Sequence, residues 1–170
     1  MADIAIRRAE AADVPALLDI YNHYVAHTHV TFDIAPRTLE QRLSWFATFA
    51  DEGFCRCFVA ARGTVPIGWA CSGPFKEKAA YATSVETSVY LAPDETGQGL
   101  GRRLYATLFE ALSQIDVHRA YGGIAQPNAA SVALHERIGF VRVGTYREVG
   151  RKFGRFWDVA VYEKAFPARP

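Results

Sequence analysis

Residues 85–112 carry the pattern that decides the fold, and they read VETSVYLAPDETGQGLGRRLYATLFEAL. Apolar and polar side chains alternate from Val85 to Leu91, which predicts a strand with Glu86 on the polar face. A glycine-rich turn follows, and leucines then recur at helical spacing from Leu104 to Leu112. The stretch therefore predicts a strand, a tight turn and a long helix in direct succession.

The turn from Thr96 to Arg102 predicts a binding site for an anion. Its glycines let the backbone turn sharply and approach a ligand closely, and the first N–H groups of the following helix favour a pyrophosphate. The turn lacks the lysine and hydroxyl of a Walker loop, and Arg102 occupies the position of the last glycine in a dinucleotide fingerprint. A turn that only reverses the chain is the alternative interpretation.

The flanking segments alternate between strand and helix patterns. Upstream, Asp13 is expected to cap one helix, and Thr38 with Gln41 forms the capping box of another. Downstream, Asn128 caps a helix through about Ile138. The expected strands lie at 4–6, 54–61, 67–72, 85–91, 120–124, 141–143 and 159–162. This order predicts an α/β (α+β) fold with a mixed sheet flanked by helices.

Composition limits the classes of protein that the chain can belong to. Its 170 residues fit one domain, 1–170, and half of them are hydrophobic, which excludes a disordered chain. The net charge is +1, so no overall field attracts nucleic acid or a membrane surface. The N-terminus has no signal-peptide pattern, and the three cysteines form no disulfide framework. A cytoplasmic location is therefore expected.

A second motif gives the chain a resemblance to a known family. Its residues are spaced N-x-x-S-x-x-L-H-x-x-x-G-F and begin at Asn128. Together with the glycine turn, the motif resembles the GNAT N-acetyltransferase superfamily. The similarity runs from about Ile4 to Glu163 and is strongest to the phosphinothricin and methionine sulfoximine/sulfone acetyltransferases. It is carried by Ile20-Tyr21-Asn22, Thr31-Phe32, Trp45-Phe46, Ala80-Tyr81, residues 85–90 and Leu134-His135-Glu136.

The resemblance implies a mostly antiparallel, twisted sheet with acetyl-CoA bound at the glycine turn after the central strand. Thr96 stands where the superfamily usually has Gln or Arg. The expected acetyl-CoA contacts are Val89, Tyr90, Leu91, Thr96, Gly97, Gln98, Gly99, Leu100, Gly101, Arg102, Asn128 and Ser131. The backbone N–H near Val89 is expected to stabilise the developing oxyanion.

Acetyl transfer to an amine needs a base for the amine proton and an acid for the leaving thiolate. Glu86 matches the branch's proposed catalytic glutamate and is the expected base, although a strand glutamate can also be a simple surface residue. His135 stands where many members have a tyrosine and is the expected acid, or an assistant to Glu86. A buried histidine that satisfies a backbone group is the alternative.

The acceptor pocket is expected to involve Phe32, Phe75, Lys78 and Tyr81, with Tyr24 nearby. Each aromatic residue could instead belong to the core. Lys78 stands where the branch often has an arginine. The histidines at positions 23, 27 and 29 lack a completing carboxylate pattern, so no metal is expected.

The sequence predicts an acetyl-CoA-dependent N-acetyltransferase that acts on a small amino-acid-like amine by direct transfer in a ternary complex. The alternatives are a protein N-terminus or a polyamine as acceptor, or a non-catalytic acyl-CoA sensor on the same fold. The expected partners are acetyl-CoA and the amine, without nucleic acid or membrane. The resemblance implies a homodimer, because related proteins are commonly dimers. Its expected interface is formed by exposed strand edges and the aromatic C-terminal residues Phe153, Phe156, Trp157 and Tyr162.

Overall fold

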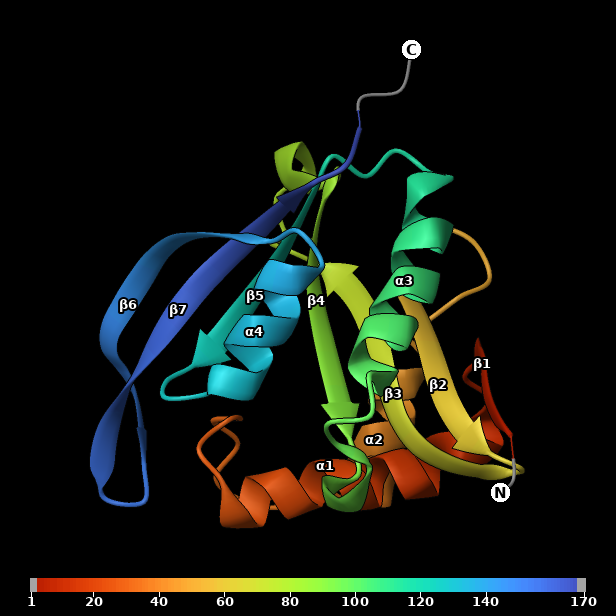
Figure 1. The fold of residues 1–170 in the computed structure, drawn as a ribbon, viewed down its shortest axis with the longest axis horizontal. Coiled ribbons are helices and arrows are strands. Elements are labelled where there is room, and N and C mark those ends of the chain that lie inside the picture. Colours follow the sequence, from red (N-terminus) through yellow and green to blue (C-terminus); the bar gives the residue numbers. More distant parts are fainter. Residues whose placement is uncertain (1–2, 168–170) are drawn as a thin grey trace.

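A seven-stranded sheet forms the centre of the protein, with strand order β1-β2-β3-β4-β5-β7-β6 (Figure 1). The computed structural model describes residues 3–167. The strands are β1 (Ile4–Arg8), β2 (Arg56–Arg62), β3 (Val65–Pro74), β4 (Ser84–Leu91), β5 (Arg119–Ala125), β6 (Val141–Lys152) and β7 (Arg155–Ala165). Every neighbouring pair is antiparallel except β4 and β5. The mostly antiparallel sheet expected from the sequence is confirmed.

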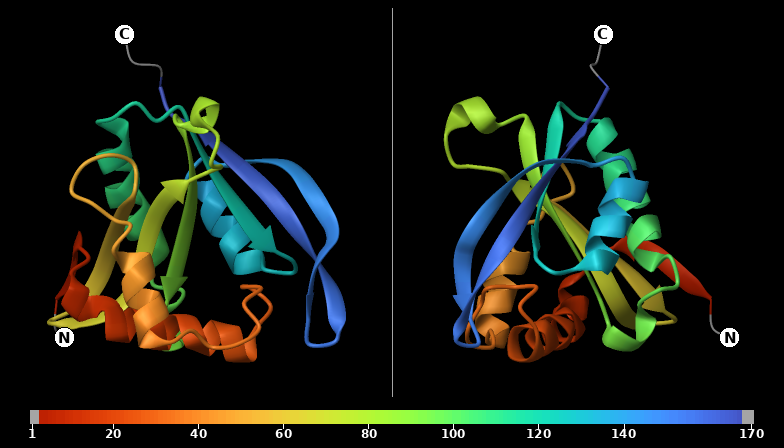
Figure 2. Two further views of the ribbon diagram at one scale, coloured as in Figure 1. Left: turned by 180° about the vertical axis from the view of Figure 1, so that it is seen from behind. Right: turned by 60° about the vertical axis from the view of Figure 1, so that its left-hand side comes forward.

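Helices cover both faces of the sheet, as Figures 1 and 2 show. The helices are α1 (Val14–His27), α2 (Leu39–Phe46), α3 (Leu100–Ser113) and α4 (Ala129–Arg137), with short 3-10 helices η1 (Ala11–Asp13), η2 (Ala79–Tyr81) and η3 (Pro93–Glu95). The leucine stripe of α3 is fully buried against one face of the sheet. Leu17 and Ile20 of α1 pack with Trp69 on the opposite face.

The sheet opens between β4 and β5. Parallel pairing joins Ser84–Glu86 to Arg119–Tyr121 and then stops, and the two strands diverge beyond that point (Figure 1). The hydroxyl of Thr87 donates to the carbonyl of Tyr121 at 3.2 Å, at the place where the strands separate. The remaining half of β4 therefore has a free edge.

Three of the expected helix ends are formed as predicted. At the start of α2, the Thr38 hydroxyl accepts from the Gln41 N–H and the Gln41 side chain accepts from the Thr38 N–H, which is the predicted capping box. The side chain of Asn128 accepts a hydrogen bond from the Ser131 N–H and so caps α4. Gly139 has a φ of 90°, and the adjacent Phe140 N–H bonds to the carbonyl of His135, which closes the helix.

Asp13 does not cap α1, and here the sequence prediction was wrong. Its carboxylate accepts two hydrogen bonds from the Arg7 guanidinium, at 2.7 and 2.8 Å, and one from the Glu10 N–H at 2.8 Å. Asp13 belongs to η1 and has helical backbone angles, so its side chain turns back toward β1. This ion pair, in which Asp13 is buried and Arg7 is partly exposed, fixes the first strand to the start of the first helix.

The last two strands form a hairpin that is much longer than expected. Phe153 and Gly154 make its turn, with φ values of 52° and 75°. Irregular register near Gly144 and between Tyr146 and Gly150 breaks the alternation that would have marked β6 in the sequence. Tyr162, expected at a subunit interface, is buried in the core at 2% exposure and cannot serve there.

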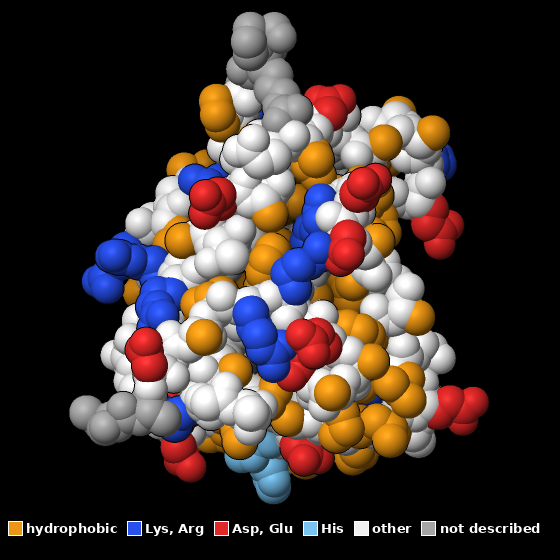
Figure 3. All heavy atoms as spheres, turned by 90° about the vertical axis from the view of Figure 1, so that its right-hand side faces the viewer, with side chains coloured by type: hydrophobic (Ala, Val, Ile, Leu, Met, Phe, Trp, Pro, Cys, Tyr) orange, Lys and Arg blue, Asp and Glu red, His pale blue; other side chains and the backbone are white. Residues whose placement is uncertain are grey.

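Charges of the two signs are interspersed on the face at the right-hand side of Figure 1, as the space-filling view in Figure 3 shows. This distribution agrees with the net charge of +1.

We expect Asp13→Asn to lower the free energy of unfolding by about 1–3 kcal/mol at neutral pH, because the Arg7 guanidinium loses a charged acceptor. Burial acts to raise the pKa of Asp13, but the hydrogen bonds from Arg7 and Glu10 hold it below its usual value. Such a carboxyl contributes stability at neutral pH that is lost as the pH falls through its lowered pKa. Urea unfolding at neutral pH and near pH 3 checks this, and the difference between the two proteins should shrink in acid. An equal difference at both pH values would contradict this role.

Candidate active site

The gap between β4 and β5 contains a cavity of about 770 Å³, a volume typical of ligand-binding sites. Its walls come from the free half of β4, the glycine turn, the start of α3, the end of β5 and one side of α4. The structure brings together here all the residues expected to contact acetyl-CoA: Val89, Tyr90, Leu91, Thr96, Gly97, Gln98, Gly99, Leu100, Gly101, Arg102, Asn128 and Ser131.

The glycine turn has the conformation that an anion site needs. Gly97 and Gly99 both have a φ of 76°, which ordinary side chains rarely adopt, and Gly99 directly precedes α3. A Cβ on Gly101 would lie 2.9 Å from Leu134 Cδ2, so this glycine lets α3 and α4 approach closely. The turn therefore directs the first N–H groups of α3 toward the cavity.

Side chains hold this turn in place from the sheet. Arg62 at the end of β2 forms an ion pair with Glu95 at 2.6 Å, and Gln98 donates to the same carboxylate at 3.2 Å. The Thr96 hydroxyl donates to the carbonyl of Pro93. The residue that departs from the superfamily pattern thus contributes to the shape of the turn.

The free edge of β4 supplies backbone donors to the same cavity. The Ala92 N–H bonds to the carbonyl of Ile67 on β3, and antiparallel pairing alternates from that point. By this alternation the N–H groups of Val89 and Leu91 point away from β3, toward the gap. The Tyr24 hydroxyl donates to the Leu91 carbonyl at 2.7 Å, which ties α1 to the end of the strand.

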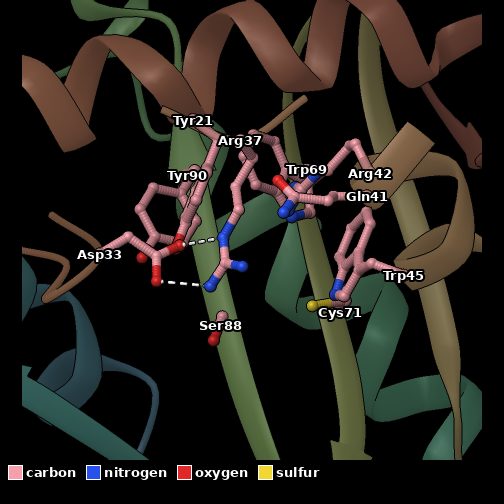
Figure 4. A pocket seen from close by; sticks show the side chains of 10 residues that line it. All are labelled: Tyr21, Asp33, Arg37, Gln41, Arg42, Trp45, Trp69, Cys71, Ser88 and Tyr90. Atoms are coloured by element: carbon pink, nitrogen blue, oxygen red, sulfur yellow. Dashed lines mark hydrogen bonds and ion pairs between the residues drawn. The ribbon is translucent and has the colours of Figure 1, made fainter. Parts of the chain in front are cut away.

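A second cavity, of about 350 Å³, lies on the opposite face of the sheet under α1 and α2 (Figure 4). Its floor is formed by β3 and β4, and Arg37 pairs with Asp33 at 2.6 Å on one side of it. Ser88 and Tyr90 line both this cavity and the one at the glycine turn. The two cavities therefore meet at β4.

Arg42 of α2 lines this second cavity and was not found from the sequence. It is only 6% exposed, and its Nε and Nη2 atoms have no hydrogen-bond partner among the described residues. Its guanidinium carbon lies 3.4 Å from the centre of the Trp45 ring and 4.8 Å from the rings of Tyr21 and Trp69. Burial lowers the pKa of Arg42, but an arginine stays charged at neutral pH.

Glu86 lies on the same face of β4 as Ser88, two residues before it and nearer the start of the strand. It is exposed to solvent and is not part of either cavity wall, although the atoms packed around its carboxyl still partly desolvate it. Desolvation raises the pKa of its carboxyl above the usual value for glutamate. This is the direction that makes a carboxylate a better proton acceptor near neutral pH.

The residues expected to bind the acceptor do not form one pocket. Phe75 stacks on Tyr121 at 4.3 Å between ring centres and contacts Tyr81 at 5.8 Å, close to the Glu86 end of β4. Lys78 is exposed just before η2. Phe32 lies elsewhere, against Gly150 of β6. None of the four residues predicted for substrate binding lines the cavity that contains Arg42.

His135 is buried at 4% exposure, and both of its ring nitrogens are already bonded. Nδ1 donates to the Ser131 carbonyl at 2.8 Å, which leaves Nε2 to accept from the Tyr105 hydroxyl at 3.2 Å. Burial lowers the pKa of His135, so the ring is neutral at physiological pH. This geometry favours a positioning role over the predicted role as acid.

Comparison with known proteins agrees with this architecture. A family profile described as "Acetyltransferase (GNAT) domain" matches residues 6–161. The chain belongs to the GNAT acetyltransferase family. It is 53% identical over 165 residues to a phosphinothricin N-acetyltransferase of Streptomyces coelicolor, covering 96% of each chain. It is 36% identical to an L-methionine sulfoximine/L-methionine sulfone acetyltransferase of Pseudomonas aeruginosa, covering 91% of this chain and 90% of the relative.

Solved structures show the same GNAT fold. A phosphinothricin acetyltransferase from Sinorhizobium meliloti, in complex with acetyl-CoA, aligns with a TM-score of 0.92 and 27% identity, covering all of this chain and 94% of the other. A ribosomal-protein-alanine N-acetyltransferase from Brucella melitensis aligns with a TM-score of 0.91 and 40% identity, covering 95% and 99%. This GNAT protein is thus an N-acetyltransferase enzyme, and GNAT structures of this kind bind acetyl-CoA.

Membrane-crossing helices and metal-binding clusters are both missing from residues 3–167. Within that range no helix is both long and apolar enough to cross a membrane. No group of three or more His, Cys, Asp or Glu side chains in the same range could hold a metal ion.

We expect Gly99→Ala to weaken acetyl-CoA binding at least 10-fold, because a side chain at this φ strains the turn that presents the N–H groups of α3. Gly53→Ala is the matched control, since Gly53 has the same φ of 76° and, like Gly99, open space around it. Both variants should lose about 1 kcal/mol of stability. Calorimetric titration with acetyl-CoA, together with thermal unfolding, separates the two effects. Equal acetyl-CoA affinities for both variants would contradict the role of the turn.

Proposed function

We propose that this enzyme transfers the acetyl group of acetyl-CoA directly to the α-amine of a small amino acid of the phosphinothricin or methionine sulfoximine/sulfone type. One observation carries this proposal: Ser88 and Tyr90 form a wall common to the cavity at the glycine turn and the cavity under α1 and α2. Two substrates held in these cavities are close enough to react without an enzyme-bound acetyl group. The names of the Streptomyces and Pseudomonas relatives support the class of acceptor.

Acetyl-CoA supplies the activated acetyl thioester, and the protein's residues bind and orient it. The N–H groups at the start of α3 and the side chains of Arg102, Asn128 and Ser131 fit its phosphates and its arm. The Val89 N–H, free at the edge of β4, is placed to stabilise negative charge on the carbonyl oxygen. All of these groups belong to residues that line the cavity at the glycine turn.

Glu86 is the proposed base, which takes the proton from the ammonium of the acceptor directly or through a water molecule. The thiolate that leaves has no proton donor in His135, because both nitrogens of that ring are bonded. We propose that His135 positions Tyr105 and Ser131 at the wall of the cavity. The alkaline side of the pH–rate profile should then be the same in His135→Gln as in the wild type. If the alkaline side is missing in the variant, His135 is the acid.

A second acceptor class has one specific observation in its favour. The Brucella relative, at 40% identity, carries the name ribosomal-protein-alanine N-acetyltransferase, so a protein N-terminus is the alternative acceptor. The cavity under α1 and α2 is lined by two arginines and one aspartate, which favours an acceptor with negative charge near its amine. A polyamine does not fit that charge.

We also propose a homodimer formed through the β6–β7 hairpin, and a cytoplasmic location. The hairpin exposes large apolar side chains at Val141, Val143, Tyr146, Val149, Phe153 and Phe156. Large apolar side chains exposed together on one hairpin are typical of an interface. Light scattering that shows only monomer would contradict the dimer.

The acceptor class is tested by thiol release from acetyl-CoA with a panel of amines. The panel contains phosphinothricin, methionine sulfone, ordinary amino acids, a polyamine and a short peptide that begins with alanine. We expect fast release with the first two acceptors. Fast release with the peptide alone would favour the protein N-terminus, and no release with retained acetyl-CoA binding would contradict the enzymatic mechanism.

We expect Glu86→Gln to lower turnover by about 10²–10⁴-fold, because the amine loses its proton acceptor, while acetyl-CoA binding is retained. The raised pKa of Glu86 should appear as the acidic side of the pH–rate profile, since activity falls as the carboxylate is protonated. That acidic side should be missing in the variant. Rates measured across the pH range check this, and an unchanged acidic side would exclude Glu86 as the base.

A further inference from the structure

Two nitrogens of the Arg42 guanidinium, Nε and Nη2, have no hydrogen-bond partner within residues 3–167, and no salt bridge of Arg42 is found in that range. Arg42 is only 6% exposed. The groups around its guanidinium are the rings of Tyr21, Trp45, Trp69 and Tyr90 and the thiols of Cys57 and Cys71. None of these groups is an anion at neutral pH, because burial raises the pKa of both thiols and of the tyrosines. A buried charge without a counter-charge is unfavourable for folding.

The acidic residue in the same cavity is already used. Asp33 accepts hydrogen bonds from Arg37 Nε and Nη2 at 2.7 and 2.6 Å, and one from the Tyr21 hydroxyl at 2.8 Å. Figure 4 shows this pair on one side of the cavity and Arg42 with Trp45 on the other. The lining therefore carries a net positive charge, because its one aspartate neutralises only one of its two arginines.

The cavity also has the size and position for a ligand. Its volume of about 350 Å³ accommodates a small amino acid, and Ser88 and Tyr90 form the wall that it shares with the cavity at the glycine turn. Arginine offers a planar fork of donors that matches a carboxylate or another oxyanion. An acceptor whose oxyanion entered here would have its amine close to the shared wall.

We infer that Arg42 is the oxyanion-binding residue of the acceptor site and that it selects amines bearing a carboxylate or phosphinate over neutral ones. This inference rests on the proposed function, and it deepens that function by naming a specificity-determining residue. The α-carboxylate and the side-chain phosphinate are two sources of the same chemistry. The Trp45 and Trp69 rings hold the guanidinium in place without neutralising its charge.

The test measures binding by calorimetry for the full chain with methionine sulfone, its α-carboxamide and phosphinothricin. We expect the wild type to bind methionine sulfone about 10–100-fold more tightly than the carboxamide, as a charged hydrogen bond implies. Arg42→Met should remove this difference and leave the affinity for the carboxamide unchanged. If Arg42→Met weakens only phosphinothricin, the phosphinate is the group that Arg42 binds.

Arg155→Met is the matched control, because Arg155 also stacks on a tryptophan, at 4.0 Å from the Trp157 ring, but is exposed. It should bind all three ligands as the wild type does. The thermal unfolding midpoint of Arg42→Met should not fall, since the substitution removes an unpaired buried charge. Should that variant fail to fold, Arg42→Lys keeps the charge without the fork and should lose affinity for the acid alone.

The inference is overturned if the wild type does not distinguish methionine sulfone or phosphinothricin from the carboxamide. It is also overturned if Arg42→Met weakens all three ligands by the same factor, or none of them. Turnover is measured separately on the same proteins. Selective binding without turnover would contradict the proposed function alone, whereas turnover without selectivity would contradict only the role of Arg42.

Discussion

The parallel pairing of β4 with β5 ends at Glu86 and Tyr121, and the binding surfaces depend on that end. A fully paired β4 would use its N–H groups in the ladder and would leave no space between the strands. Because the pairing stops, the edge of β4 keeps donors that a ligand can use, and α3 and α4 can line the space from one side. The glycines of the turn then bring the positive end of α3 to the same place.

The same strand separates two environments of different character. On the α3 side, the binding groups are largely backbone, and the cavity suits a long ligand with phosphates. On the α1 and α2 side, the binding groups are charged side chains and aromatic rings in a smaller space. Arg42 is unfavourable there for stability alone, and it resembles the unpaired polar groups that proteins retain where they bind ligands. The two cavities thus lie on opposite sides of a single strand, with Ser88 and Tyr90 in the wall of both.

Structural features that depend on sequence neighbours alone could be predicted from the sequence. Features that depend on how the chain folds back on itself could not. The glycine turn, the Asn128 cap and the Gly139 helix end depend on neighbouring residues and were predicted correctly. Asp13 was assigned to a cap because an aspartate followed by Pro15 is typical of a helix start. Its carboxylate instead binds Arg7, six residues earlier, and helix periodicity does not indicate this contact because Arg7 lies on a strand. The lengths of β6 and β7 were underestimated because bulges interrupt their alternation. Arg42 was missed because a charged residue in an amphipathic helix is expected to face solvent.

The long hairpin also meets the segment that carries Asp33. A Cβ at position 150 would lie 2.3 Å from the Phe32 ring, and Lys152 Nζ donates to the Thr31 carbonyl at 2.8 Å. The hairpin and this segment are therefore fastened together at two adjacent points. A library of variants should accept many residues at the exposed tip, but at position 150 only glycine leaves the Phe32 ring undisturbed. A larger residue at position 150 would therefore have to be accompanied by a smaller one at position 32.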